Sequence, residues 1–229
     1  MLKKKIAVFD VDGTIFRSSL LVELTDALVQ EGIFPPQVRD AYNSYYQRWL
    51  DRQGPYGDYI QAVIDEFEKN AQGVRMKDFL RVAGHVGSFH RNRTYRYTRD
   101  LVAELKKKKY YLLAISGSPK VVVDVFAKYL GFDKIYARMQ EVDKKNRLTG
   151  RTMHEGLIND KAQILLRAVE HEGLSLRNSI GVGDTMSDVS FLEMVTKPIC
   201  FNPNRELYDY AKKKGWKIVV ERKDVVYSL

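Results

Sequence analysis

Acidic side chains directly follow two short apolar runs of the sequence. Asp10 and Asp12 come after a run near the amino terminus, and Asp184 and Asp188 come after another run far along the chain. Short continuous apolar runs are typical of buried parallel strands, and open α/β sheets bind ligands beyond the carboxyl ends of such strands. Carboxylates crowded at one edge resist joint ionisation unless a cation neutralises them. The spacing therefore predicts one acidic, metal-dependent site, and hence an enzyme.

Groups that suit an anion occur at two other positions. The apolar run 110–115 is followed by the Ser116 hydroxyl, the Gly117 backbone and Ser118, which can cap the helix expected next. A hydroxyl, a glycine backbone and a helix amino terminus together form a natural oxyanion site. Lys161 lies in the first turn of another expected helix, where the helix dipole disfavours a cation. An anionic partner in the site explains that placement.

The elements that must position these residues alternate between strand and helix, which indicates a parallel sheet covered on both faces. Strands are expected at residues 5–10, 110–116, 135–139, 179–183, 197–201 and 216–221, with a small hairpin over 142–152. Helices are expected between them, at residues 119–130, 160–172 and 187–194. We therefore predict an α/β fold with a doubly wound, mostly parallel Rossmann-like sheet and helices on both faces.

Residues 17–94 interrupt this alternation, because strand signals vanish there and helical ones take over. Helices are expected from Ser18 or Ser19 to Gly32, from Pro35 to near Gly54, and over a stripe that ends near Gly73. We expect an inserted α-helical cap at 17–94 and a core domain made of residues 1–16 and 95–229. A cap directly after the first acidic loop can fold over the site, exclude water and select substrates.

Composition limits the classes of protein to which this chain can belong. The 229 residues fit one domain or a domain with an insertion, and 45% hydrophobic content excludes global disorder. The single cysteine, Cys200, lies in an apolar run and is expected to be buried, in a reducing compartment. No signal peptide is visible, and no apolar stretch approaches the roughly 18 residues of a membrane span. We expect a soluble, cytoplasmic protein with no membrane partner.

The net charge of +9 would suit a protein that binds nucleic acid, but its placement argues otherwise. Lysines cluster at residues 3–5, 106–109 and 212–214, each directly before an expected strand. In a parallel sheet these clusters fall at the amino-terminal edge, opposite the acidic site. The last two also end expected helices, where cations are favoured by the dipole. We interpret the clusters as solvated helix ends and do not expect nucleic acid as a partner.

Four motifs, at residues 10–14, Ser116, Lys161 and 183–188, occur in the order of those of the haloacid dehalogenase-like superfamily. The chain resembles that superfamily over essentially its whole length. It is similar in particular to the phosphoserine-phosphatase-like branch (subfamily IB), whose helical cap follows the first motif directly. The tail from Phe201 to Trp216 also resembles that branch.

This resemblance implies a phosphomonoester hydrolase that acts on a small phosphorylated metabolite. Asp10 would attack phosphorus and form an aspartyl-phosphate, and Asp12 would protonate the leaving oxygen and then activate water. The resemblance implies Mg²⁺ held by the Asp10 carboxylate, the Asp12 main-chain carbonyl and Asp184.

The resemblance implies further roles around the phosphate. Ser116, the Gly117 amide and Lys161 would hold phosphoryl oxygens and stabilise developing charge. Asp188 would orient Lys161 or a metal-bound water.

Alternatives to this reaction remain. Within the superfamily, a phosphotransferase or mutase would pass the phosphoryl group to a second substrate instead of water. From a different class, the chain could be a basic nucleic-acid-binding protein that retains this fold. Nothing in the sequence sets the oligomeric state.

The substrate is also open. Phosphoserine phosphatases carry a substrate-gripping glutamate where this chain has Ser19; Glu23 lies four residues later, and no clear counterpart of their cap arginine is visible. Aromatic residues gather in the cap, at Tyr42, Tyr45, Tyr46, Trp49, Tyr56 and Tyr59. They suit a pocket for a cationic or ring-bearing leaving group, but packing of the cap is the interpretation that we favour.

Overall fold

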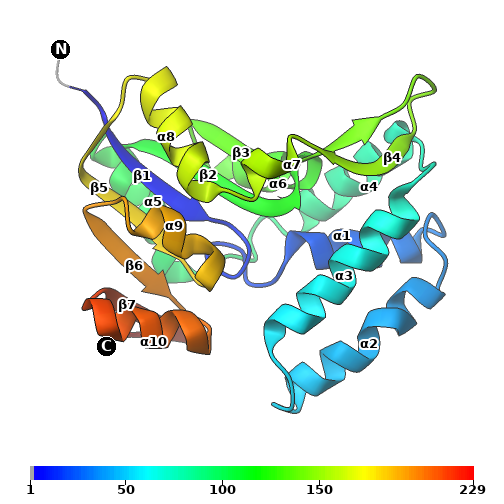
Figure 1. Ribbon diagram of the computed structural model, residues 1–229, viewed down its shortest axis with the longest axis horizontal. Helices are drawn as coiled ribbons and strands as arrows, with labels where there is room; N and C mark the ends of the chain where they lie inside the picture. Colours follow the sequence, from blue (N-terminus) through cyan, green and yellow to red (C-terminus); the bar gives the residue numbers. More distant parts are fainter. Residues whose placement is uncertain (1–2) are drawn as a thin grey trace.

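The computed structural model describes residues 3–229, so Met1 and Leu2 of the expected core segment 1–16 lie outside the described residues. Within that range the strands form one sheet in the order β4-β3-β2-β1-β5-β6-β7-β8 (Figure 1). The strands are β1 (Lys5–Asp10), β2 (Tyr111–Pro119), β3 (Lys134–Val142), β4 (Leu148–Met153), β5 (Ser175–Gly183), β6 (Lys197–Phe201), β7 (Lys217–Arg222) and β8 (Val225–Ser228).

The sheet is parallel from β3 to β7, and only its edge strands, β4 and β8, are antiparallel to their neighbours. β1 lies between β2 and β5, so the chain winds outward from it in both directions. Ligands bind at such a switch point in open α/β sheets. The expected doubly wound, mostly parallel α/β fold is confirmed.

Helices cover both faces of the sheet (Figure 1). They are α5 (Arg96–Lys107), α6 (Lys120–Ala127), α7 (Glu155–Ile158), α8 (Lys161–His171), α9 (Val189–Leu192) and α10 (Arg205–Lys214), with 3₁₀ turns at Lys128–Leu130 and Met186–Asp188. Strand side chains alternate between the two faces. Phe9 and Leu112 pack with α5 and α6, whereas Val8 and Leu113 pack with α8, α9 and α10. Both faces are therefore buried, which accounts for the continuous apolar runs.

The segment between β1 and α5 is helical, and it extends past the carboxyl edge of the sheet (Figure 1). Its helices are α1 (Leu20–Gln30), α2 (Gln37–Leu50), α3 (Tyr56–Ala71) and α4 (Met76–Phe89). Leu24 and Leu28 on α1 and Val63 on α3 are fully buried. The hairpin of β3 and β4 supports this unit, because Leu148 exchanges backbone hydrogen bonds with Gly73 and Val74 at 2.8 Å.

Helices α4 and α7 and strand β8 were not expected from the sequence. Helix α4 falls in the helical segment but carries its own apolar stripe, Phe79, Val82 and Val86, which packs toward α1 and α6. Strand β8 is exposed along its length and pairs antiparallel with β7, a pairing that periodicity does not reveal.

The basic clusters lie where parallel strands begin. β1 starts at Lys5, while β2 and β7 each start a few residues after a helix that ends at Lys107 or Lys214. Since β1, β2 and β7 run in the same direction, the three clusters share the amino-terminal edge.

The described helices include none with the length and apolar character that crossing a bilayer requires.

Candidate active site

The strand register brings the sequence motifs to one place. Asp10, the last residue of β1, pairs with Ile115, which directly precedes Ser116. On the other side, Phe9 pairs with Val182, two residues before Asp184. Because the three strands are parallel and in step, the loops that follow them emerge side by side.

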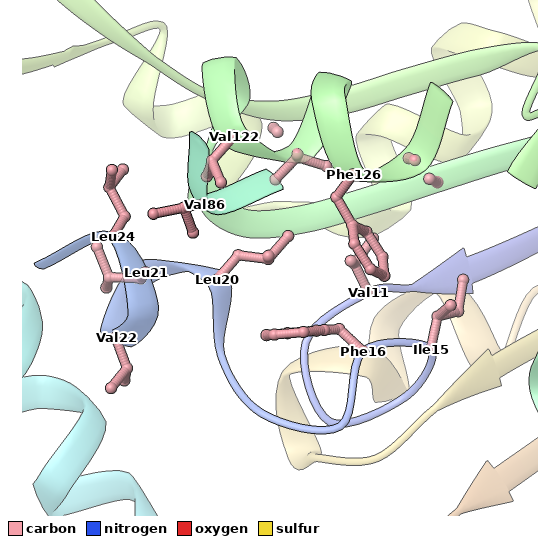
Figure 2. Packing of buried hydrophobic residues seen from close by; sticks show 14 of the residues in the cluster. Val11, Ile15, Phe16, Leu20, Leu21, Val22, Leu24, Val86, Val122 and Phe126 are labelled. Carbon is pink, nitrogen blue, oxygen red and sulfur yellow. The ribbon is translucent and has the colours of Figure 1, made fainter. Parts of the chain in front are cut away.

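Buried apolar side chains anchor the loop after β1. Val11, Ile15 and Phe16 are fully buried, and the ring of Phe16 packs against that of Phe126 on α6, with 5.1 Å between the ring centroids (Figure 2). The backbone bends at Gly13, whose φ is 78°. A Cβ at this glycine would lie 2.1 Å from a carboxylate oxygen of Asp184, so only glycine allows the two loops to approach this closely.

Lys161 joins two of these carboxylates. Its Nζ donates to Asp10 Oδ1 at 2.7 Å and to Asp188 Oδ1 at 2.5 Å, and the residue is only 8% exposed. Burial acts to lower the pKa of Lys161, but the charges of Asp10 and Asp188 outweigh it and raise that pKa above its usual value. Lys161 is therefore a fixed buried cation, which explains why it occupies an unfavourable helix terminus.

Asp188 organises the loop after β5. It is fully buried, and its Oδ2 accepts hydrogen bonds from the backbone N–H groups of Asp184 at 2.9 Å and Thr185 at 3.1 Å. Since its Oδ1 is held by Lys161, both carboxylate oxygens of Asp188 are engaged by the protein. Asp188 therefore positions Lys161 and the backbone of Asp184.

Asp12 contacts both β2 and the first helix after the loop. Its Oδ2 accepts from the Ser116 hydroxyl at 2.7 Å, and its Oδ1 accepts from Leu20 N–H at 2.5 Å. Ser18 or Ser19 was the expected cap of α1, but Asp12 supplies the side-chain oxygen there, and Ser19, the residue before the helix, makes no capping hydrogen bond. Burial raises the pKa of Asp12, although the hydrogen bonds from Ser116 and Leu20 oppose that effect. A carboxyl with a raised pKa suits a group that both gives and takes a proton.

The carboxyl end of β2 differs from the expected capping arrangement. Ser118 does not cap α6, which begins after Pro119 without a side-chain cap in the described chain. Its hydroxyl instead accepts from Leu21 N–H of α1 at 2.9 Å, and its own N–H donates to Ser116 Oγ at 3.0 Å. The first N–H groups of α1 have no acceptor within their own helix, and one of them, that of Leu21, takes the Ser118 oxygen as its acceptor. Gly117 is exposed, and a Cβ there would meet nothing within 4 Å.

The carboxylates fit a divalent cation. One oxygen of each of Asp10, Asp184 and Asp188 lies within 4.8 Å of the others. Burial raises the pKa values of Asp10 and Asp184 well above their usual range, and neighbouring carboxylates push the pKa of each in the same direction. A cation beside them would relieve this cost, and hard divalent cations prefer oxygen ligands. Because the oxygens of Asp188 already have donors, Asp10 and Asp184 are the carboxylates available to a cation.

Two residues near Asp184 had no role in the sequence interpretation. Thr14 Oγ1 lies 3.4 Å from Asp184 Oδ1, and Asn204 N–H donates to the Asp184 carbonyl at 2.9 Å. Asn204 also caps α10 by accepting from Leu207 N–H at 2.9 Å. An asparagine before an amphipathic helix signals such a cap, but its contact with Asp184 depends on the tertiary fold.

A cleft of about 660 Å³ opens beside these loops, between the core and the helices α1, α2 and α3. Gly13, Asp184 and Glu23 line it, whereas Ser19 is 5% exposed and does not. Glu23 is held by Arg93, with 2.6 Å between Oε1 and the guanidinium, and by His90 at 3.2 Å. A glutamate and an arginine therefore do face the cleft, but they are paired with each other.

A family model and several known proteins are similar to this chain over most of its length. The family model described as haloacid dehalogenase-like hydrolase matches residues 7–193. A phosphoserine phosphatase of Archaeoglobus fulgidus is 27% identical over 212 residues, which is 91% of this chain but only 56% of that protein. A phosphoserine phosphatase of Methanocaldococcus jannaschii is 24% identical over 225 residues, 97% of this chain and 95% of that one.

Among solved structures, a substrate-bound phosphoserine phosphatase complex superposes with a TM-score of 0.65 and 21% identity. The match covers 98% of this chain and 96% of that one, so the two share a fold.

Proposed function

The chain belongs to the haloacid dehalogenase-like hydrolases, and from that premise we propose that it is a Mg²⁺-dependent phosphomonoester hydrolase working through an aspartyl-phosphate. Its substrate in this proposal is a small phosphorylated metabolite. The observation that carries the proposal is the contact of Lys161 Nζ with Asp10 Oδ1 at 2.7 Å, between residues 151 positions apart. Curated relatives named as phosphatases support it.

In the first half of the reaction, a carboxylate oxygen of Asp10 forms a bond to phosphorus while the bond from phosphorus to the leaving oxygen breaks. Asp12 gives its proton to that oxygen, and burial, which raises the pKa of Asp12, favours its protonated form. Lys161 holds the Asp10 carboxylate in place. Ser116, the Gly117 amide and Lys161 are the groups that we assign to the phosphoryl oxygens.

In the second half, water attacks the phosphorus of the aspartyl-phosphate, and the bond from phosphorus to Asp10 breaks to release inorganic phosphate. Asp12 takes the proton of that water, which restores its starting state. We assign Mg²⁺ to the carboxylates of Asp10 and Asp184 and the main-chain carbonyl of Asp12, with Asp188 positioning Lys161 rather than binding the metal. When bound, the ion neutralises charge on the phosphoryl oxygens.

We further propose that residues 17–94 act as the cap and that 1–16 and 95–229 form the catalytic core. Helix α1 supports this division, because its first N–H groups are held by Asp12 and Ser118 of the core while its apolar side packs with α4 (Figure 2). The cap would thus be tied directly to the reaction centre.

The test measures free phosphate released from a panel of phosphorylated metabolites, with Mg²⁺ and no added acceptor. Asp10→Asn should abolish turnover, whereas Asp100→Asn, an exposed carboxylate on α5, should not change it. Chelation should remove activity, and added Mg²⁺ should restore it. Phosphate release that survives in Asp10→Asn would refute the proposal, and turnover only with a second alcohol present would indicate a phosphotransferase.

A further inference from the structure

Aromatic rings line the cleft on the side of α2 and α3. Tyr42 and Tyr59 are 4% and 6% exposed and form the buried layer of this cluster. Tyr46, Trp49 and Tyr56 are half-buried and line the cleft, with ring centroids 6.0 Å apart from Tyr46 to Trp49 and 5.0 Å apart from Trp49 to Tyr56. Packing of the cap accounts for the two buried rings. The three half-buried rings, called the aromatic wall below, keep surface available to a ligand.

The aromatic wall begins beside the reaction centre. Tyr56 lines the same cleft as Gly13 and Asp184. From Tyr56 the aromatic wall continues to Trp49, whose ring centroid lies 5.0 Å from that of Tyr56, and both rings line this cleft. A group attached to a phosphorus at the catalytic centre would therefore extend along the rings.

Charge in the cleft disfavours a cationic leaving group. The two acidic residues of the cleft away from the catalytic carboxylates are already paired, Glu23 with Arg93 at 2.6 Å and Asp26 with Arg39 at 3.0 Å. Because an arginine already neutralises each of these carboxylates, neither offers an uncompensated negative charge to a cation. The cationic half of the expectation from the sequence is therefore not supported.

Arginine side chains without a carboxylate partner also line the cleft. Among the described residues, no carboxylate lies within 4.0 Å of Arg17 or Arg52. Arg17 is placed over the ring of Tyr95 at 5.5 Å. Arg52 follows α2, and its backbone N–H donates to the Trp49 carbonyl at 3.1 Å, which places its backbone beside Trp49 of the aromatic wall. Its φ of 60° is one that glycine or asparagine adopts more easily.

We infer, on the premise of the proposed phosphatase activity, that the alcohol released from the substrate carries a flat aromatic ring and an anionic group. The ring stacks on the aromatic wall, and the anionic group pairs with Arg52. Stacking between flat rings adds to the gain from burying their area, and an arginine recognises carboxylates through its planar fork. Neither contact touches the groups that break the phosphorus–oxygen bond, so both act on substrate choice.

Matched synthetic esters test the two halves of this inference. Benzyl phosphate and cyclohexylmethyl phosphate differ in aromatic character at similar size, and we expect a kcat/KM ratio of about five in favour of benzyl phosphate. A benzyl phosphate with a 4-carboxylate should exceed one with a 4-trimethylammonium group by about fivefold. Equal values within either pair, or a preference for the ammonium ester, would overturn the inference.

Variants assign these preferences to residues. Trp49→Leu should bring the aromatic ratio to about one, while Trp49→Phe, which keeps a flat ring, should retain most of it. Arg52→Gln should remove the preference for the carboxylate. Tyr45→Leu is the matched control on α2, because Tyr45 is 40% exposed and does not line the cleft. Ratios that survive in Trp49→Leu, or that fall equally in Tyr45→Leu, would overturn the inference.

Ethyl phosphate, a phosphomonoester that carries neither a ring nor a carboxylate, separates the two levels of failure when it is assayed beside the metabolite panel. If the wild-type protein hydrolyses ethyl phosphate or a member of the panel but shows no preference within the ester pairs, the inference about the leaving group is wrong and the proposed function stands. If it releases phosphate from none of the esters and from no member of the panel, the proposed function itself is wrong.

Discussion

The two sides of the cleft are built in opposite ways. On the core side, Asp10, Lys161 and Asp188 are at most 8% exposed and are held together by contacts of 2.5 to 2.7 Å between distant segments. On the cap side, Tyr46 and Trp49 are half-buried neighbours on one helix, held by ring packing. The hydrogen bonds of the core side fix the positions of Asp10, Lys161 and Asp188 relative to one another. In the described chain the side chains of the cap side make no such bonds to these residues, so they can be replaced without moving them. Changes in the core should therefore affect every substrate alike, and changes in the cap should affect discrimination.

Asp12→Asn should have the largest effect among the predictions that test this comparison. The amide oxygen of asparagine can still accept from Leu20 N–H, and its NH₂ group can donate to the Ser116 hydroxyl in place of the bond that Asp12 accepts there. The amide cannot, however, exchange a proton with the leaving oxygen or with water. We expect kcat to fall about 10²- to 10⁴-fold, by a similar factor for benzyl and cyclohexylmethyl phosphate. Steady-state phosphate release measures both. A fall confined to one ester would contradict the comparison, because it would give Asp12 a role in selection.

Gly13→Ala should disturb the core side through geometry alone. The added methyl group would lie 2.1 Å from Asp184 Oδ2, at a φ of 78° that alanine adopts poorly, so the Asp184 loop must move. A displacement of about 1 Å in such a site lowers turnover about 10²-fold. The apparent affinity for Mg²⁺, measured from activity against metal concentration, should weaken too.

The control for this change is Gly84→Ala on α4, where a Cβ would meet nothing within 4 Å. That variant should keep full activity and unfold at the same or a higher temperature, because alanine favours helix more than glycine does. Equal loss of activity in Gly13→Ala and Gly84→Ala would show that turnover does not depend on the close approach of Gly13 to Asp184.

The core side could be predicted from the sequence to a much greater extent than the cap side. Asp10, Ser116 and Asp184 each directly follow an apolar run that reveals a strand, and parallel register then brings them together without further information. Cys200 is buried in β6, as its apolar run predicts. These inferences succeed because they depend on local patterns and on one general rule about parallel sheets.

What the sequence did not reveal are contacts between elements that no local pattern relates. Ser118 precedes a helix and therefore resembles its cap, but in the structure its hydroxyl binds Leu21 N–H of a different helix. Similarly, Ser19 is in the right place to cap α1, yet Asp12 supplies the oxygen instead. In both cases the competing partner comes within reach only once the cap lies on the core.

Ser118→Ala tests a hydrogen bond that connects the core side to helix α1. The variant removes the acceptor of Leu21 N–H at a buried position, which should lower the free energy of unfolding by about 1 kcal/mol. Urea denaturation monitored by circular dichroism measures the change. Ser44→Ala, on the exposed surface of α2, is the matched control and should be neutral within about 0.5 kcal/mol. An unchanged Ser118→Ala protein would show that this hydrogen bond does not hold the cap.

His90→Gln should have the smallest effect, and it probes the cap side through stability rather than turnover. Burial lowers the pKa of His90 below its usual 6.5, and Arg93 acts in the same direction, although Glu23 opposes both. In the unfolded chain His90 gains a proton as the pH falls through about 6.5, whereas the folded protein takes up that proton only at lower pH. The unfolded state therefore binds more protons in this window, so the free energy of unfolding falls as the pH drops below 6.5.

Glutamine cannot take up this proton, so the His90→Gln variant should lose less stability than the wild type between about pH 7.5 and about pH 5.5. Urea titrations at each pH give the two slopes, and His171→Gln, an exposed histidine on α8, is the matched control. Equal slopes for wild type and His90→Gln would contradict the prediction. A reduced slope together with unchanged kcat for ethyl phosphate would sharpen the comparison, because it would show a titrating group of the cap that affects folding and leaves the chemistry of the core alone.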